Sequence, residues 1–491
     1  MKYLRINPEA WRRFFFWAVV FMVAAWLAPE LWARLGGGGG YSGGGGSSSS
    51  GGGGGGGGEL IGLWIEFCFH YPHIGLPITG IAICIFYVVK NNEISSIVVT
   101  PSPRTPANWD ALRAHDENFS EVLFRDFGYS LFSKIHEARG SGQLGRYSQY
   151  LNDSARTNLA MLHSALTDVQ GVVVGGLTVH DLVVPAEPKE QVSVRLMYEA
   201  NYTEVSVAGE RAVYSHQVWH LSRRAGVLSP EPDRISSLGC VGCGSPLEPQ
   251  PDGTCPHCGN QYERGEYHWF VTGITELNRR EVGPALTSKA ADVGLNLSTV
   301  YDPNLEGQRA QFIERYPDMD FKVAVARFQH IYHTLQKSWS EQDLDQLRPF
   351  ETDSLFQNHR YWVEEYQRQN LRNVLKEVTL DNIELVKIRS DKFYDAITCR
   401  LFASMIDYTQ DDNGKVLCGS TSRSTRFSEY WIFVRGRGAA ENAKGDAVCP
   451  NCAAELKISM AGECEYCGSK LTSGQFDWVL SEIQQDEEYA G

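Results

Sequence analysis

Apolar side chains recur three and four positions apart in two widely separated stretches of the chain. The first stretch carries Phe119, Val122, Leu123, Phe127, Leu131 and Ile135. The second carries Phe321, Ala324, Val325, Phe328, Ile331, Tyr332 and Leu335. This spacing places the apolar side chains of each stretch along one side of an α-helix. We therefore predict two amphipathic helices, each with its apolar side against a hydrophobic core.

Each predicted helix is followed by a stretch in which apolar and polar residues alternate. The apolar positions of the first stretch are Val192, Val194, Leu196, Tyr198, Ala200 and Tyr202, and those of the second are Ile397, Cys399, Leu401, Ala403 and Met405. Alternation with a period of two predicts β-strands with one buried face. Asn413-Gly414 predicts a tight hairpin turn, and we expect Cys399 and Cys418 to be buried thiols of this hairpin.

Two further strands are predicted in each half, with a cysteine-containing loop between them. Residues 218–223 and 430–435 precede the loop, and residues 269–274 and 478–483 follow it. The separation between Trp269 and Trp478 equals that between Ile274 and Ile483. Helices come first and strands second in both halves. The pattern therefore indicates an α+β fold with an internal duplication.

Each loop contains two Cys-x-x-Cys knuckles with eleven residues between them. The cysteines are Cys240, Cys243, Cys255 and Cys258 in the first loop, and Cys449, Cys452, Cys464 and Cys467 in the second. Four thiolates at this spacing suit a tetrahedral zinc ion and leave no position for a catalytic water. We predict two structural Zn²⁺ ions in zinc ribbons at 238–260 and 447–469. Disulfides are the alternative use of these cysteines, whereas the metal interpretation implies a reducing compartment.

A glycine follows three of the four knuckles (Gly244, Gly259 and Gly468), and glycine suits the left-handed turn around the metal.

The two ribbons carry little positive charge. Residues 240–258 contain no Lys or Arg, Lys457 is the only such residue in 449–467, and the whole chain has a net charge of −14. Nucleic-acid phosphates need cationic side chains, so we predict no nucleic-acid partner.

The amino-terminal region predicts a membrane anchor. Residues 1–35 form a hydrophobic anchor or a signal segment with a basic end, 36–58 a flexible Gly/Ser-rich loop, and 60–90 a transmembrane segment. Residues 91–108 are a linker. Basic residues flank the apolar segments, which predicts one or two spans with the soluble domains in the cytoplasm.

Glu66, His70 and His73 share one helical side near the outer end of the second span. Ionisable groups within membranes often form proton or metal sites, and the alternative is that these three lie at headgroup level. Cys68 and Cys84 are predicted to be small apolar residues of the span.

Several short motifs resemble those of Tim44-like domain proteins of the bacterial type. They are residues 115–120 before the first helix, 335–339 and 343–347 in the second half, and the strands at 430–435 and 478–483. The resemblance covers most of 109–484 and the amino-terminal layout, and it implies two cone-shaped domains similar to nuclear transport factor two. On this basis the domains are 109–280 and 319–485, joined by a connector at 281–318 and followed by an acidic tail at 486–491.

The resemblance implies a membrane-tethered, non-enzymatic scaffold at the bacterial inner membrane that serves protein transport or translocation through a protein partner. The cone pockets allow an alternative, a carrier of lipids or small molecules. A pocket enzyme of the isomerase or dehydratase type is a further alternative, with His163, His180 and Asp181 as its nearest candidates. His180 and Asp181 are neighbours in a predicted strand and should point to opposite faces, which disfavours a cooperating pair.

Overall fold

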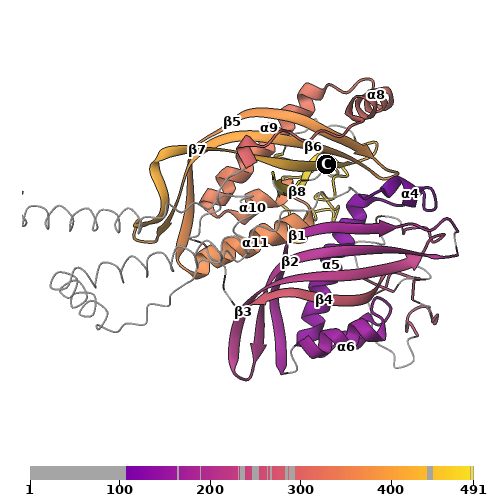
Figure 1. Ribbon diagram of the computed structural model, residues 1–491. Coiled ribbons are helices and arrows are strands. Elements are labelled where there is room, and N and C mark those ends of the chain that lie inside the picture. Colours follow the sequence, from indigo (N-terminus) through magenta and orange to yellow (C-terminus); the bar gives the residue numbers. More distant parts are fainter. Residues whose placement is uncertain are drawn as a thin grey trace, which may run out of the picture. The chain divides into compact units, whose positions relative to one another are not determined.

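The computed structural model (Figure 1) describes residues 107–162, 165–187, 189–230, 232, 238–240, 242–245, 254–261, 264–265, 268–281, 283, 286, 294–439, 446–486, 488–489 and 491. The predicted segments 1–35, 36–58 and 60–90 lie outside these residues, as do Glu66, His70, His73, Cys68, Cys84 and His163. Among the residues that are described, no helix is both long enough and apolar enough to cross a membrane.

The first half consists of helices followed by a four-stranded antiparallel sheet. The helices are α4 (Trp109–Arg113), α5 (Glu121–Gly140), η2 (Leu144–Tyr147) and α6 (Asp153–Leu162). The strands are β1 (Leu166–Val183), β2 (Gln191–Ser206), β3 (Gly209–Arg224) and β4 (Phe270–Arg280), hydrogen-bonded in chain order. The first cysteine-containing loop lies between β3 and β4.

The second half repeats this order of elements. Its helices are α8 (Leu305–Arg315), α9 (Phe321–Glu341), α10 (Leu344–Leu347), η4 (Arg348–Phe350) and α11 (Asp353–Arg368). Its strands are β5 (Leu371–Ser390), β6 (Tyr394–Asp411), β7 (Val416–Gly436) and β8 (Val479–Gln485), again antiparallel and in chain order. The second cysteine-containing loop lies between β7 and β8, so the two halves have the same sheet topology.

The predicted amphipathic helices are confirmed as α5 and α9. Ser120 caps the start of α5 by accepting a hydrogen bond from the amide of Leu123, and Asp320 caps α9 by accepting one from Lys322. The two helices pack on β1 and β5, respectively. Most of the two predicted apolar stripes is buried, in the core of the first half for α5 and of the second half for α9.

The predicted strands are confirmed as well. All six apolar positions from Val192 to Tyr202 in β2 are buried, as are the five from Ile397 to Met405 in β6. The chain turns at Asn413-Gly414 between β6 and β7, and the thiols of Cys399 and Cys418 are buried. Trp219 of β3 lies opposite Ile274 of β4, and Trp431 of β7 lies opposite Ile483 of β8, so equivalent residues have equivalent partners.

The connector predicted at 281–318 contains part of the second half. Helix α8 buries Phe312 in the second core, and the backbone amide of Asp302 donates a hydrogen bond to the carbonyl of Val386 at 2.9 Å. The second half therefore begins before residue 319. Polar and charged residues outnumber apolar ones in α8, and only Phe312 of the helix is buried, which explains why the sequence reads as a connector.

The acidic tail predicted at 486–491 is partly buried. Asp486 is buried and forms an ion pair of 2.8 Å with Arg400 of β6, and Tyr489 stacks on Tyr430 with ring centres 3.9 Å apart. Arg400 is itself buried, and a buried guanidinium requires a counter-charge. Asp486 supplies that charge and holds the end of the chain on the sheet.

Candidate metal centres

All four knuckles have the same backbone hydrogen bonds. In the first, the amide of Cys240 donates to the carbonyl of Ser245 at 2.7 Å, and the amide of Gly244 donates to the carbonyl of Cys240 at 2.8 Å. The amides of the first cysteines of the other three knuckles likewise donate to Asn260, Ala454 and Ser469, at 3.0, 2.8 and 2.9 Å. This repeated turn brings both sulfurs of a knuckle to one side, where they face a common point.

The residue after each knuckle has a positive φ angle. Gly244, Gly259 and Gly468 have φ of 74°, 71° and 70°, and Ala453 occupies the equivalent position with φ of 60°. Glycine adopts this conformation without steric cost, whereas alanine does not. The fourth knuckle therefore forms the same turn as the others despite its side chain.

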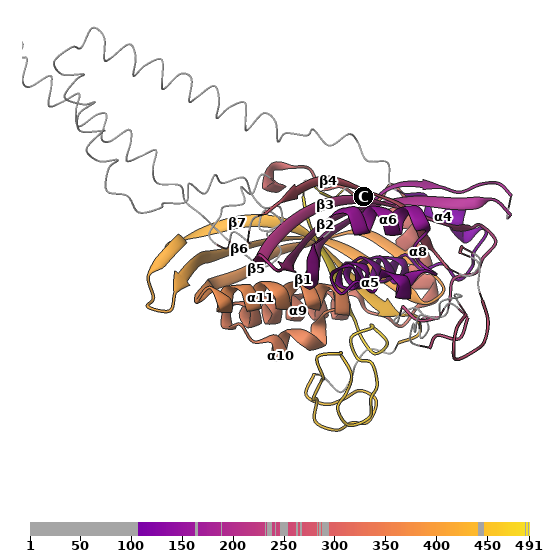
Figure 2. The same cartoon turned by 90° about the horizontal axis from the view of Figure 1, so that it is seen from below.

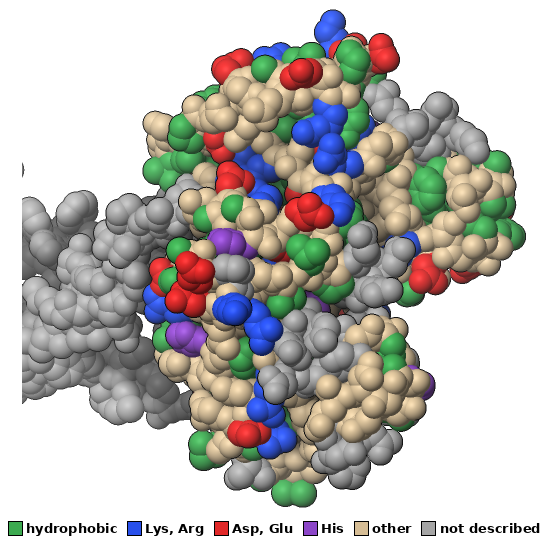
Figure 3. Space-filling view, turned by 90° about the vertical axis from the view of Figure 1, so that its right-hand side faces the viewer, with side chains coloured by type: hydrophobic (Ala, Val, Ile, Leu, Met, Phe, Trp, Pro, Cys, Tyr) green, Lys and Arg blue, Asp and Glu red, His purple; other side chains and the backbone are tan. Residues whose placement is uncertain are grey.

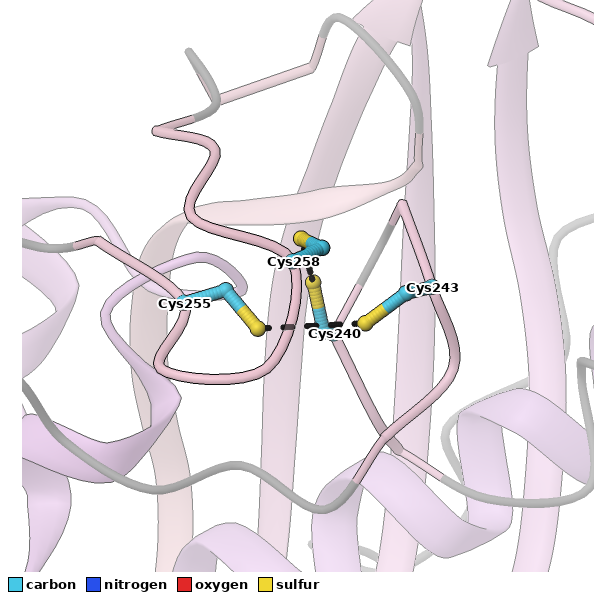
Figure 4. A group of neighbouring side chains, drawn as sticks. All are labelled: Cys240, Cys243, Cys255 and Cys258. Carbon is cyan, nitrogen blue, oxygen red and sulfur yellow. Dashed lines mark hydrogen bonds between the residues drawn. The ribbon is translucent and has the colours of Figure 1, made fainter.

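The eight cysteines come together in two clusters, Cys240, Cys243, Cys255 and Cys258, and Cys449, Cys452, Cys464 and Cys467. Within each cluster, all four Sγ atoms lie within 4.8 Å of one another. Figure 4 shows the first cluster, with sulfurs from both knuckles pointing toward a shared centre.

The sulfur separations fit a tetrahedral metal ion. The Sγ atoms of Cys240 and Cys258 are 3.9 Å apart, and those of Cys243 and Cys255 are 3.8 Å apart. The equivalent pairs in the second cluster are separated by 3.8 and 3.9 Å. A tetrahedron with Zn–S bonds of about 2.3 Å has edges of about 3.8 Å, whereas a disulfide bond is about 2.0 Å long. Each cluster can therefore hold one metal ion of this size, and the cysteines are not paired covalently.

Polar groups around the sulfurs favour thiolates at some positions. Backbone amides, first that of Cys258 and then that of His257, lower the pKa of Cys255 to about 6. The hydroxyl of Ser469 does the same for Cys467, whose pKa is also about 6. Burial raises the pKa of Cys240 to about 12, and a bound dication would overcome this cost because its charge stabilises the adjacent thiolate.

Each cluster offers four sulfur ligands, which fill the coordination sphere of a tetrahedral ion. Cys449 and Cys464 are almost completely buried at 0% and 1% exposure, and Cys240 and Cys255 are each at 4%. Because four thiolates occupy all four positions, none is left for substrate or water. The arrangement is suited to stabilising a loop and not to catalysis.

The first ribbon is fastened to the helical part of its own half. The hydroxyl of Tyr150 donates a hydrogen bond to the carbonyl of Gly239 at 2.9 Å. Arg264 donates from Nε to the carbonyl of Ser148 at 2.9 Å, and it pairs with Asp153 at 3.2 Å. These contacts connect the ribbon to the turn before α6 and to the first turn of that helix.

The second ribbon, seen as yellow loops in Figure 2, is fastened through a charged network around Asp353. Asp353 accepts hydrogen bonds from Lys470 at 2.6 Å and from Thr472 at 3.1 Å, and it forms an ion pair with Arg348. Arg348 is 1% exposed, and its Nε donates to the carbonyl of Met460 at 3.0 Å. The ribbon is thereby joined to the start of α11.

The residues considered for a pocket enzyme are not assembled into a buried site. The β1–β2 register shifts between Val179 and Asp181, so the regular alternation expected at His180 is interrupted by a β-bulge. His180 and Asp181 are both exposed, and Asp181 forms an ion pair with Arg195 on the sheet surface. The third candidate, His163, lies outside the described residues.

Charged side chains of both signs are mixed on the molecular face in Figure 3, where Lys and Arg stand beside Asp and Glu. Ion pairs within one helix occur among the described residues, such as Arg360 with Glu364 of α11 at 2.7 Å. Exposed pairs of this kind contribute little free energy.

Sequence reasoning missed a buried arginine that recurs in both halves. The guanidinium of Arg223 lies 4.6 Å from the ring centre of Trp269, and that of Arg435 lies 4.7 Å from the ring centre of Trp478. Arg223 also pairs with the buried Asp116 at 2.5 Å. The available signal was the arginine at the end of the predicted strands 218–223 and 430–435.

A second buried pair was also missed, and it occurs only in the second half. His359 of α11 and Glu351 before it are 1% and 0% exposed at their side chains, and their Nδ1 and Oε1 atoms are 2.5 Å apart. Backbone contacts identify the equivalent residues in the first half. Leu151 forms a parallel bridge to Val271, as Glu351 does to Leu480, and Leu159 is the residue eight positions after Leu151. The first half thus has two buried leucines at these positions.

Comparison with known proteins gives one partial match. No curated protein matches the chain. Residues 308–444, which extend from the first turn of α8 to just beyond β7, match the model of the Tim44-like domain family, and the second half of this chain therefore contains a Tim44-like domain.

Proposed function

We propose that this protein is a membrane-tethered, non-enzymatic scaffold that binds a protein partner during transport or translocation. The Tim44-like domain at 308–444 is the observation that carries the proposal, because such domains are associated with protein translocation and with membranes. The apolar segments at 1–35 and 60–90 supply the tether, and the soluble domains lie at the cytoplasmic face of a bacterial inner membrane.

The first half, 109–280, is in this proposal a diverged second copy of the same domain, and both copies are cones of the nuclear-transport-factor-two type. Support comes from the shared order of elements, the identical strand order of the two sheets, and the equivalent pairing of Trp219 with Ile274 and of Trp431 with Ile483. Two related domains on one tether give two attachment surfaces, which suits a scaffold.

Each cysteine cluster binds a structural Zn²⁺ in this proposal. The sulfur separations of 3.8 and 3.9 Å and the exclusively thiolate ligand set support zinc. The ion would fasten the long connection between the last two strands, which is otherwise costly to order. A thiolate site of this type also requires a reducing compartment, in agreement with a cytoplasmic location.

Cross-linking in native membranes followed by mass spectrometry tests the proposal. The intact chain should recover a discrete protein partner, and a version that lacks 109–491 should not. A third version with Cys449→Ser and Cys464→Ser shows whether the second ribbon is needed for that contact. If no partner exceeds the background of the shortened version, the scaffold proposal is wrong, and bound lipids or small molecules become the next subject of search.

A further inference from the structure

Helix α11 connects the two halves of the described chain. Asn358 donates from Nδ2 to the carbonyl of Val174 in β1 at 3.0 Å. Ser354, in the first turn of α11, donates its hydroxyl to Oδ1 of Asp126 in α5 at 3.0 Å. We call this contact region between α11, α5 and β1 the junction.

Three carboxylates meet at the junction, and two of them have cationic partners. Asp353 of α11 accepts a hydrogen bond from Lys470 at 2.6 Å. Glu482 of β8 pairs with Arg125 of α5 at 3.3 Å. Asp126 has the hydroxyl of Ser354 as its hydrogen-bond partner, and no Lys or Arg of the described residues forms an ion pair with it.

The surroundings of Asp126 disfavour its charged form. Partial burial between α5 and α11 raises the pKa of this carboxyl to about 7, and the negative charges of Asp353 and Glu482 add to the effect. The hydrogen bond from Ser354 and the positive charge of Lys470 act in the opposite direction but are weaker than the burial. On α5 itself, Arg125 is already engaged by Glu482. Burial, and then the negative charges of Glu482 and Asp126, raise the pKa of Tyr129, which also lies on α5.

We propose that Asp126 makes the junction sensitive to pH, because the neutral carboxyl fits between α5 and α11 whereas the ionised carboxylate adds a third negative charge there, one with which no Lys or Arg of the described residues forms an ion pair. This device is independent of the proposed scaffold function. It would loosen the attachment of α11 to the first half as the pH rises, and so vary how firmly the two halves are held together.

The sign of the effect follows from proton linkage. The closed junction holds the Asp126 proton up to about pH 7, whereas an open junction exposes a carboxyl with an ordinary pKa near 4. Between these two values the closed form binds one more proton than the open form. The ratio of closed to open junctions should therefore fall by up to about tenfold per pH unit in this window and become constant above it.

Hydrogen exchange of the full chain measures this ratio. Protection factors of peptides from α11, corrected for intrinsic exchange rates, are compared between pH 4.5 and 8.5. We expect protection to fall across the window in the wild type, and the fall to disappear in Asp126→Asn, which keeps the shape of the side chain without a charge. Asp412→Asn is the matched control, because Asp412 is an exposed carboxylate in the β6–β7 turn.

Ser354→Ala provides a second, conservative variant. Loss of the hydroxyl removes a group that lowers the pKa of Asp126, so the fall in protection should extend to higher pH than in the wild type. The proposal is overturned if Asp126→Asn has the same pH profile as the wild type and as Asp412→Asn. It is equally overturned if α11 protection in the wild type does not change between pH 4.5 and 7.

Discussion

At the scale of single residues, Ala453 is the exception among the four knuckles. It has φ of 60° at a position where the other three knuckles have glycine. A left-handed conformation costs a residue with a Cβ about 1 kcal/mol relative to glycine. We expect Ala453→Gly to stabilise the second ribbon by up to about 1 kcal/mol, measured as slower release of metal to a chelator.

The reciprocal change serves as the control. Gly468→Ala places a Cβ in the same conformation, with φ of 70°, in the other knuckle of the same ribbon. It should accelerate metal release by a similar factor. Equal release rates for the two variants would mean that the backbone of these turns does not limit the stability of the site.

Glu351 and His359 form a buried pair at positions where the first half has Leu151 and Leu159. The fold therefore accommodates two apolar side chains at these sites. Replacement of both partners of a buried hydrogen bond by apolar groups of similar shape can be nearly neutral or stabilising, whereas removal of one partner leaves a buried polar group unsatisfied, at a cost of about 1 to 3 kcal/mol. We expect Glu351→Leu with His359→Leu to keep or raise the free energy of unfolding, and either single change to lower it.

Denaturant unfolding of the single and double variants tests this expectation. A double variant that is less stable than both single variants would contradict it. That result would show that the polar pair stabilises the second core and that two leucines, which suffice in the first half, cannot replace it there.

At the scale of elements, the sequence predicted the strands in which apolar residues recur at every second position, and it gave little sign of the strands in which this pattern is broken. Apolar residues occupy every second position over 192–202 in β2 and over 397–405 in β6, and both strands were identified from them. Strand β1 was predicted only near its end, where His180 and Asp181 were placed in a strand, and β5 was missed. Their pairing with the next strand is interrupted by four and three register shifts, and each shift breaks the alternation of apolar and polar residues. A period-two search does not detect such strands.

The cysteine clusters were predictable because their signal is local, whereas the contacts that fasten the ribbons were not. Two knuckles and the loop between them lie within about twenty residues, so spacing alone identifies the cluster. Arg348 and Asp353, in contrast, meet the second ribbon across more than one hundred positions of the chain. Arg400 and Asp486 are also far apart in the chain, and their pairing buries part of the acidic tail.

Arg348 is the residue on which the attachment of the second ribbon most depends. Its guanidinium is buried and bonds to Met460, Glu351 and Asp353. Hydrogen bonds from charged groups contribute about 1.5 to 3 kcal/mol each. We expect Arg348→Ala to increase hydrogen exchange across 446–474 while the first ribbon stays unchanged.

Arg264→Ala is the matched change just after the first ribbon, where the side chain is about one-third exposed and its contacts are weaker. Its effect should be confined to the first ribbon and should be smaller. If Arg348→Ala leaves exchange of 446–474 unaltered, the ribbon is held by the metal alone and not by the network around Asp353.

At the scale of the whole molecule, one architecture is repeated with different chemistry. Both halves place a four-sulfur cluster between their last two strands and a buried arginine over a tryptophan. The family match covers 308–444 and so excludes the second cluster as well as the first half. The clusters are therefore a feature of this chain that the Tim44-like match does not account for.

The central claim is that each half is built around its own structural zinc ion. Native mass spectrometry of the full chain, purified under reducing conditions, tests it most directly. We expect two zinc ions per chain, one in Cys255→Ser, one in Cys464→Ser and none in the double variant. Near-zero metal in the wild type, or an unchanged count of two in either single variant, would contradict the account.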